Sequence, residues 1–527
     1  MTSRIKKTRR ILCNDDSWIL TEAIAPLTVR DLKERMIDTY KNTPVGALCW
    51  CVGDHEVYSY ETKVGEVFGE GFDSFESDTD RREYENTRKL IEDAGGPLTA
   101  LTKLCHEADM DIFPSVRMNS HSAGDSSSPR YGRFRREHPE YLIGKPGVAY
   151  TEGSLPWGIR TGINYAREEV REHMAKIITE LFERFETDGV ELDFMRHPAF
   201  FRLDEAYANR YLMTDLMRYV RQRMDDVITA SGRDIELVVR VPSNLATAQR
   251  IGLDVGVWIA EGLVDIVVAG GGYVPFEANV REFVEAAEGT DCLIYGGIEH
   301  LNPTVDEDVI RAIASRFWHA GVSGIYFFNY FGKPTEWKQR IYNQVADPEV
   351  LRRLNKKYHV DHMQRVAARD FVELRDLHNY PYQDAVPPTQ LPVTLPYTLT
   401  APGPILRLEM ADDLDTATAE GAVAYCVLRL MLENFKGEDD LEVRLNQQVL
   451  SSARESFDGF KRLEWMDYGP RLDEVHYSGG IMEFDITSPP LRQGVNELEI
   501  RMIKRTVQQA EPVILQDVEL AVTYNNK

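Results

Sequence analysis

Two acidic residues stand two positions apart in a short apolar segment, residues 189–194. Glu191 and Asp193 would point to the same side of a strand, because side chains alternate along it. Arg196 and His197 follow directly. Burying two carboxylates is unfavourable unless each is paired or takes part in chemistry. Carboxyl groups are suited to acid–base and nucleophilic catalysis. We therefore expect Asp193, at the end of the segment, to be a reacting group.

Glu299 is the acid best placed to complete a catalytic pair. It follows another apolar segment, 292–298. If both segments are strands of one parallel barrel, their carboxyl ends lie at the same end of that barrel, which is called its mouth below. Hydrolysis of a glycosidic bond needs one carboxyl group to protonate the leaving oxygen and a second on the other side of the bond. We predict that Asp193 and Glu299 form this pair, with Glu299 as the acid; a helix-start or rim acid is the alternative for Glu299. The reserve candidates are Asp15, Asp16 and Glu152.

The order of the segments predicts the elements that position these acids. Apolar segments alternate with helical patterns, of which 164–186 is the clearest because its apolar residues form one stripe. This alternation predicts a parallel sheet, and eight units over about 340 residues fit a (β/α)8 TIM barrel, an α/β fold. The doubly wound alternative lacks its phosphate fingerprint, which the glycines at 270–272 do not match. The predicted strands cover 9–13, 45–52, 111–118, 189–194, 236–241, 264–269, 292–298 and 324–328.

The character of the chain changes after the barrel. Residues 346–384 read as a helical extension followed by a proline-rich linker. From residue 385, short alternating runs are separated by Gly, Pro, Asp and Asn, which predicts an antiparallel, jelly-roll-like β-sandwich over 385–527. The catalytic barrel would then occupy 1–345. We expect the sandwich either to bind carbohydrate or to brace the barrel.

Every predicted strand ends in polar or aromatic residues, and active sites of barrel enzymes lie at those ends. Asp54 and His55 follow the second strand. Trp18, Trp50, Trp157 and Tyr273 could offer flat apolar faces to sugar rings. The predicted substrate-binding residues are Asp15, Asp16, Arg117, Asn119, His121, Glu191, Arg196, His197, Arg240, Asn244, Tyr273, His300 and Asn329.

Two arginines interrupt apolar strands and must be paired if they are buried. Arg117 lies in the third strand and Arg240 in the fifth. Glu191, on the strand between them, is the predicted partner of either. Such a cluster could be purely structural, yet it would place positive charge beneath Asp193 and favour its ionised form.

The overall composition narrows the classes of partner. The net charge of −24 argues against nucleic acid and anionic membranes, which need a basic surface. The sequence has neither a run of about 18 apolar residues nor a signal-peptide pattern at its start. The six cysteines read as reduced thiols. We therefore expect a cytoplasmic protein that binds a carbohydrate substrate; its oligomeric state, a homo-oligomer included, is open.

No metal and no cofactor are expected. The histidines at the strand ends could instead ligate a metal, which would make the protein a metal-dependent hydrolase or lyase. However, the first strand has no His-x-His and the chain has no His-Glu-x-x-His. A carbohydrate-binding barrel without catalysis is the other alternative.

Two motifs carry a family resemblance. Residues 162–171, GINYAREEVR, open a helix that leads to DGVELD at 188–193. The combination resembles glycosyl-hydrolase-like family 10, specifically over 162–198 and in layout over 9–340. The resemblance implies a barrel that hydrolyses carbohydrate, with Asp193 as the matching acid of the fourth strand. Those relatives commonly continue with a second Asp and aromatic residues, where this chain has FMRH.

Other barrel hydrolases fit less well. In the chitinase type the fourth strand ends Asp-x-Asp-x-Glu, and Met195 stands where that last acid would be. In the α-amylase type an arginine precedes the nucleophile by two residues, where this chain has Glu191. The expected class is therefore a glycoside hydrolase of an oligo- or polysaccharide, without a more specific mechanism.

Overall fold

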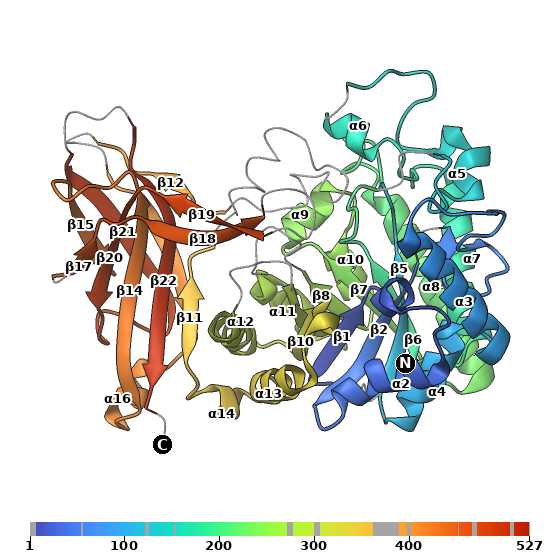
Figure 1. Ribbon diagram of the computed structural model, residues 1–527, viewed down its shortest axis with the longest axis horizontal. Coiled ribbons are helices and arrows are strands. Elements are labelled where there is room, and N and C mark those ends of the chain that lie inside the picture. Colours follow the sequence, from blue (N-terminus) through green and yellow to red (C-terminus); the bar gives the residue numbers. More distant parts are fainter. Residues whose placement is uncertain are drawn as a thin grey trace.

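A computed structural model describes most of the chain (Figure 1). The described residues are 7–53, 56–121, 126–151, 154–270, 278–299, 306–361, 389–397, 402–451, 453–465, 472–505 and 511–525.

Eight parallel strands close into a barrel, which confirms the predicted fold class. β1 pairs with both β2 and β10, so this sheet has no free edge between them. Each strand begins and ends within about two residues of its predicted range, because buried apolar runs that end in polar residues mark strands clearly. The barrel strands are β1 (Ile11–Asp15), β2 (Val45–Gly53), β5 (Asp111–Arg117), β6 (Gly189–Asp193), β7 (Glu236–Val241), β8 (Ile266–Ala269), β9 (Leu293–Glu299) and β10 (Gly324–Phe328).

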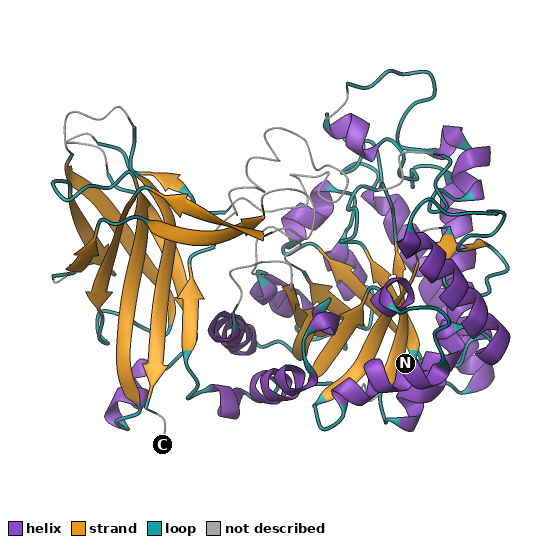
Figure 2. Cartoon of the chain, in the orientation of Figure 1, coloured by secondary structure: helices purple, strands orange, loops and turns teal. Residues whose placement is uncertain are grey.

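Helices surround the barrel (Figure 2). In α7, Val170, Met174 and Leu181 lie on the buried stripe that the sequence predicts. The helices that follow the strands in order are α1 (Trp18–Glu22), α2 (Val29–Arg35), α3 (Asp78–Ala94), α4 (Pro97–Glu107), α7 (Glu168–Arg184), α8 (Arg210–Ser231), α9 (Leu245–Arg250), α10 (Val255–Ala260), α11 (Val280–Ala287), α12 (Glu307–Ala320) and α13 (Thr335–Val345).

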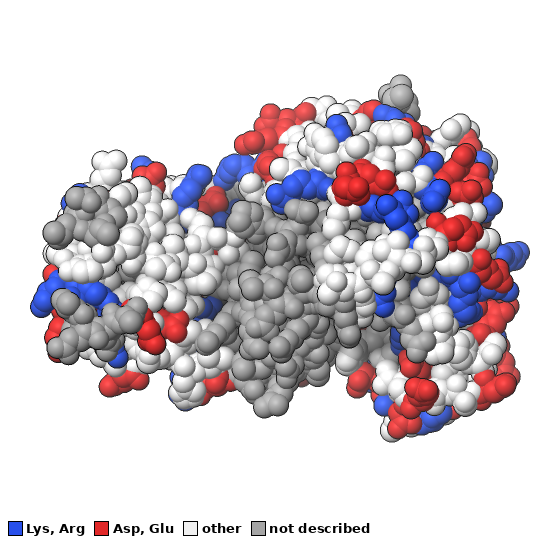
Figure 3. Space-filling model, turned by 90° about the horizontal axis from the view of Figure 1, so that it is seen from above, with Lys and Arg blue, Asp and Glu red and all other residues white. Residues whose placement is uncertain are grey.

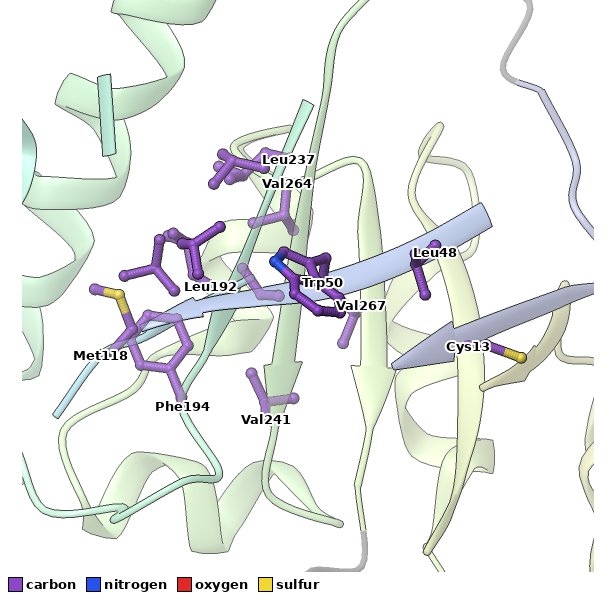
Figure 4. Packing of buried hydrophobic residues seen from close by; sticks show 14 of the residues in the cluster. Cys13, Leu48, Trp50, Met118, Leu192, Phe194, Leu237, Val241, Val264 and Val267 are labelled. Carbon is purple, nitrogen blue, oxygen red and sulfur yellow. The ribbon is translucent and has the colours of Figure 1, made fainter. Parts of the chain in front are cut away.

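The barrel strands separate two apolar regions. Leu12, Phe113 and Tyr295 belong to a small cluster inside the barrel. Trp50 and Leu192 belong to the larger cluster between the strands and the helices (Figure 4). Because side chains alternate along a strand, this division shows which residues of each strand can reach the barrel mouth.

The two long loops that the sequence predicts contain short elements. The loop after β2 carries β3 (Val57–Tyr58) and β4 (Glu66–Val67), and the loop after β5 carries α5 (Arg133–Glu137) and α6 (Leu155–Ile159). Glu56 and Arg135 join the loops through a buried ion pair. Arg135 also donates to the backbone oxygens of Ser120 and Thr161, at 3.4 Å each. This pair therefore fixes the backbone that leads to His121.

Two antiparallel sheets form the C-terminal sandwich, as predicted. One has the order β11-β22-β14-β20-β17, with β12 on β22, and the other has the order β13-β21-β15-β16. The strands are β11 (Lys356–His359), β12 (Val393–Thr394), β13 (Ile405–Met410), β14 (Val423–Glu433), β15 (Asp440–Leu445), β16 (Gln448–Val449), β17 (Ala453–Ser456), β20 (Gly479–Asp485), β21 (Gly494–Lys504) and β22 (Ile514–Tyr524). A separate hairpin joins β18 (Phe460–Trp465) to β19 (Leu472–Tyr477).

The predicted helical extension contains both a helix and a strand. α14 (Pro348–Leu351) is helical, but β11 pairs with β22 and belongs to the sandwich. Residues 362–388, which include most of the predicted linker, lie outside the described residues. The domain boundaries themselves therefore stay predictions.

The surface and the thiols give little further information on partners. Acidic and basic side chains intermingle over the face seen in Figure 3. All six cysteines are free thiols. Within the described ranges, no helix has the length and apolar character to cross a membrane.

Candidate active site

Three backbone turns with unusual geometry lie at the mouth of the barrel. Ser17, His197 and Asn329 follow the ends of β1, β6 and β10, and their φ angles are 58°, 57° and 62°. A positive φ is uncommon for residues other than glycine. Such strain persists only where the surroundings impose it, and it gathers at functional sites. The mouth is therefore the first place to seek a site.

Arg240 holds Asp193 and Glu299 at this mouth. Its Nη1 donates to Asp193 Oδ1 at 2.8 Å, and its Nη2 donates to Glu299 Oε1 at 2.5 Å. Its guanidinium lies 3.8 Å from the centre of the Phe328 ring. All three charged side chains are 3% exposed. The structure thus brings together the two carboxyl groups that the sequence suggests as a pair, on strands that are not neighbours.

Asp193 is surrounded by hydrogen-bond donors. Its Oδ1 accepts from the backbone N–H of Met195 at 2.9 Å and of Arg196 at 3.3 Å, in addition to Arg240. The tight turn after β6 supplies both backbone donors. Donors of this kind suit a carboxylate anion.

The carboxyl group of Glu299 has a raised pKa. Burial raises the pKa of its carboxyl to about 7, and nearby Asp193 and Asp16 act in the same direction. Arg240 opposes this shift. A carboxyl group with this pKa is largely protonated below neutral pH and can donate a proton there.

Among the residues that the structure describes, Glu191 forms no ion pair with an arginine, which corrects the sequence expectation. Tyr326 donates to Glu191 Oε1 at 2.7 Å. Burial raises the pKa of Glu191 to about 7, with Asp193 acting in the same direction. Glu191 is fully buried, deeper in the barrel than Asp193. Arg240 itself, and not a cluster around Glu191, therefore supplies the positive charge beside Asp193.

A second ionic group lies between β1, β5 and β10. Arg117 Nη2 is 2.9 Å from Asp16 Oδ2, and Asn329 donates to the same oxygen at 2.8 Å. Arg117 and Arg196 lower the pKa of Asp16 through their positive charge, against the effect of burial. Four of the predicted residues thus share one place at the mouth.

Asp15 faces away from the mouth. It shares a side of β1 with Cys13, which packs between the barrel and the helices. Its Oδ1 accepts from the backbone N–H of Trp18 at 3.3 Å. Burial raises the pKa of Asp15 to about 7, and Lys338 of α13 opposes the shift. In the structure Asp15 therefore supports the first turn of α1.

The two predicted asparagines are occupied by backbone groups. Asn119 donates to the backbone oxygens of Ile163 and Ala199, at 2.9 and 2.6 Å, while its own side-chain oxygen accepts two backbone N–H groups. Asn244 caps α9 by accepting from the N–H of Thr247 at 2.8 Å. Loop and helix formation account for both side chains.

Two of the predicted histidines, His121 and His197, lie together. The rings of His121 and His197 meet edge to face, with centroids 5.3 Å apart, and both residues are 1% exposed. Gly162 allows the neighbouring backbone to approach, because a Cβ atom there would lie 2.4 Å from His121 Cδ2.

The predicted aromatic faces differ widely in access. Trp50 is fully buried behind β2, and Trp157 packs against Arg160 with the guanidinium 4.2 Å from its ring. Trp18 is 49% exposed. The remaining predicted residues lie outside the described ranges: Asp54, His55, Glu152, Tyr273 and His300.

Two further residues at the mouth, Asn14 and Ser243, have no role predicted from the sequence. Asn14 is 2% exposed and points into the barrel, where its register partners are Cys49 and Phe328. Its side-chain oxygen and the Ser243 hydroxyl have no hydrogen-bond partner among the described residues. Asn14 and Ser243 both stand at predicted strand ends. Asn14 faces inward and its neighbour Asp15 faces outward, a difference that depends on the strand register.

Metal-ligating side chains do not cluster in the part of the chain that the structure describes. No three His, Cys, Asp or Glu residues there lie together in a way that could hold a metal ion.

The comparisons with known proteins add little. The chain matches no family model, and no curated protein matches it. The α-L-fucosidase isoenzyme 2 of Paenibacillus thiaminolyticus aligns at 10% identity and a TM-score of 0.40, over 65% of this chain and 49% of that one, so this chain spans about half of it. The PgaB glycoside hydrolase domain of Bordetella bronchiseptica aligns at 11% and 0.39, over 65% and 99%.

A family 18 N-acetylglucosaminidase from Paenibacillus barengoltzii aligns at 14% and 0.36, over 64% and 99%. At TM-scores this low the likenesses carry no argument, and the barrel assignment rests on the strand order.

Proposed function

We propose that this protein is a glycoside hydrolase that cleaves a glycosidic bond in an oligo- or polysaccharide. The single observation that carries the proposal is that Arg240 bonds to Asp193 and Glu299 together at the barrel mouth. Glycosidic cleavage by this route needs two carboxyl groups beside one bond, in different protonation states.

The two carboxyl groups are suited to different roles. Glu299 donates its proton to the leaving oxygen, since its pKa is raised to about 7. Asp193, held by backbone N–H groups and Arg240, acts on the anomeric carbon. It either attacks this carbon directly or activates a water molecule, and the anomeric configuration of the first product distinguishes the two routes.

The test is a screen of the purified protein against aryl glycosides and oligosaccharides, followed by substitution. Asp193→Asn and Glu299→Gln should each lower kcat by about 10²–10⁴-fold, and thermal unfolding of each variant checks that it is folded at the assay temperature. Asp215→Asn is the matched control, because Asp215 is 55% exposed on α8, and it should keep wild-type kcat.

Three outcomes would contradict the proposal. Near-normal turnover by Asp193→Asn would remove Asp193 from the chemistry. Activity that a chelator abolishes and a divalent metal restores would favour a metal-dependent hydrolase or lyase. A protein that retains glycans without releasing product would be a binding barrel instead.

A further inference from the structure

An aromatic pair with one exposed ring stands at the mouth beside the ionic group around Asp16. Trp18 stacks on Phe331, with ring centroids 5.3 Å apart and planes 22° from parallel. Trp18 nevertheless remains 49% exposed. Exposing apolar area to water is unfavourable by about 25 cal/mol per Å². A ligand that covers the exposed ring with an apolar face would therefore gain binding free energy.

The backbone holds both rings in place. Ser17 and Asn329, which precede the two turns, adopt positive φ angles of 58° and 62°. Asp15 accepts from the backbone N–H of Trp18 at 3.3 Å. Asn329 donates to Asp16 Oδ2 at 2.8 Å, which joins the turn after β1 to the turn after β10. The pair is thus positioned before any ligand arrives.

The pair lies on the Glu299 side of the catalytic carboxyl groups. β9, β10 and β1 are consecutive neighbours in the barrel. Glu299 is in register with Phe328, which is in register with Asn14. Asp16 also contributes to the raised pKa of Glu299, so their carboxyl groups are close enough to interact. Around the closed sheet, β10 is one strand from β9 and four from β6, and β1 is two strands from β9 and three from β6, so the pair lies nearer to Glu299 than to Asp193.

The side-chain oxygen of Asn329 is a hydrogen-bond acceptor near the pair. Asn329 is 6% exposed, and its side-chain oxygen has no hydrogen-bond partner among the described residues. A buried acceptor left unpaired costs about 1–3 kcal/mol. An aromatic face with a buried acceptor at its edge matches a pyranose, which has an apolar C–H face and hydroxyl groups around its rim.

We infer that Trp18, backed by Phe331, forms a second sugar-binding subsite that holds the leaving-group sugar, with a hydroxyl donating to Asn329. This inference rests on the proposed function, because the acid must face the leaving oxygen. It narrows the substrate to glycans with a sugar on the leaving side of the cleaved bond.

The kinetic test compares two substrates that share the cleaved sugar. One is an oligosaccharide identified by the activity screen, and the other is the glycosyl fluoride of the same sugar, whose leaving group cannot stack on Trp18. Trp18→Ala should lower kcat/KM for the oligosaccharide about tenfold and for the glycosyl fluoride clearly less. Trp18→Phe should recover part of the loss. Equal losses on both substrates, or no loss, would overturn the subsite.

A binding test does not depend on turnover. Full-length Asp193→Asn protein is applied to an array of neutral and acidic oligosaccharides, with and without Trp18→Ala. Glycans retained only while Trp18 is present would support the subsite, even if Asp193 proved not to be catalytic. The matched control is Tyr219→Ala, since Tyr219 is 50% exposed on α8. Identical retention with and without Trp18, or retention of no glycan at all, would overturn it.

Discussion

Asp193 and Glu299 bond to the same guanidinium but have different surroundings. Two backbone N–H groups donate to Asp193, whereas burial dominates the environment of Glu299 and raises its pKa to about 7. In the proposed mechanism Arg240 is a positioning residue with two effects. It orients both carboxyl groups, and it keeps the pKa of Glu299 lower than burial alone would set it.

The pH profile should report this balance. Glu299 must be protonated to act as an acid, so kcat/KM of the wild type should fall as pH rises through about 7. Arg240→Gln removes the charge that lowers the pKa of Glu299, so this alkaline limb should move to higher pH while the maximal rate falls. Arg240→Lys should keep the limb closer to the wild type but lose rate, because an ammonium cannot make the planar, two-armed contact.

The measurement is kcat/KM across the pH range on one identified substrate, with thermal unfolding of each variant as the folding check. A limb that stays in place, or that moves to lower pH in Arg240→Gln, would contradict the assigned roles.

The residues of the site were more predictable than their contacts. Both arginines were expected to need carboxylates, and both have them. Which carboxylate each meets depends on the strand register and on the barrel closing β1 against β10, neither of which can be read from one strand. Glu191 thus found Tyr326 instead. Asn119 and Asn244 satisfy backbone groups, a role that residue type alone does not separate from sugar binding.

At the scale of elements, the sequence pattern predicted those strands whose residues are buried next to one another along the chain. The barrel strands are buried along their length and mostly apolar, so their ranges were clear. β11 was missed because its sequence is Lys-Lys-Tyr-His. Lys356 pairs with Asp412, Lys357 with Asp306, and His359 with Asp517. These partners are distant in sequence, so the strand looks like a charged helix until the sheet is assembled.

The loops at the mouth depend on the buried pair of Glu56 and Arg135, which gives an element-scale prediction. Arg135→Met keeps the bulk but leaves Glu56 buried without its cation, which should cost about 3–5 kcal/mol. We expect a lower thermal midpoint and faster amide exchange in α5. Adding Glu56→Gln should recover part of the loss, because the uncompensated charge is then removed. Exposed Arg133→Met is the control. Unchanged exchange in α5 would contradict this role for the pair.

At the scale of the whole molecule, α12 connects the two halves. Ile313 and Phe317 pack in the barrel cluster, while Ala312 is the one residue of the barrel in the sandwich cluster of the described residues. Arg281 and Arg316 both contact Glu409 of β13, at 3.3 and 3.2 Å. Such contacts support the interpretation that the sandwich braces the barrel, while carbohydrate binding by the sandwich remains a separate proposal.

A substitution on α12 tests this bracing. Ala312→Arg would place a long cation in the apolar contact between the barrel and the sandwich, beside the positive charge of Arg316. Burying a charge among apolar side chains is strongly unfavourable. We expect differential scanning calorimetry to show one main transition for the wild type. In Ala312→Arg a separate sandwich transition should appear at lower temperature. His319→Arg, at an exposed position of the same helix, should keep the wild-type profile. If Ala312→Arg also keeps it, the two halves unfold independently of this contact, and the sandwich does not stabilise the barrel through α12.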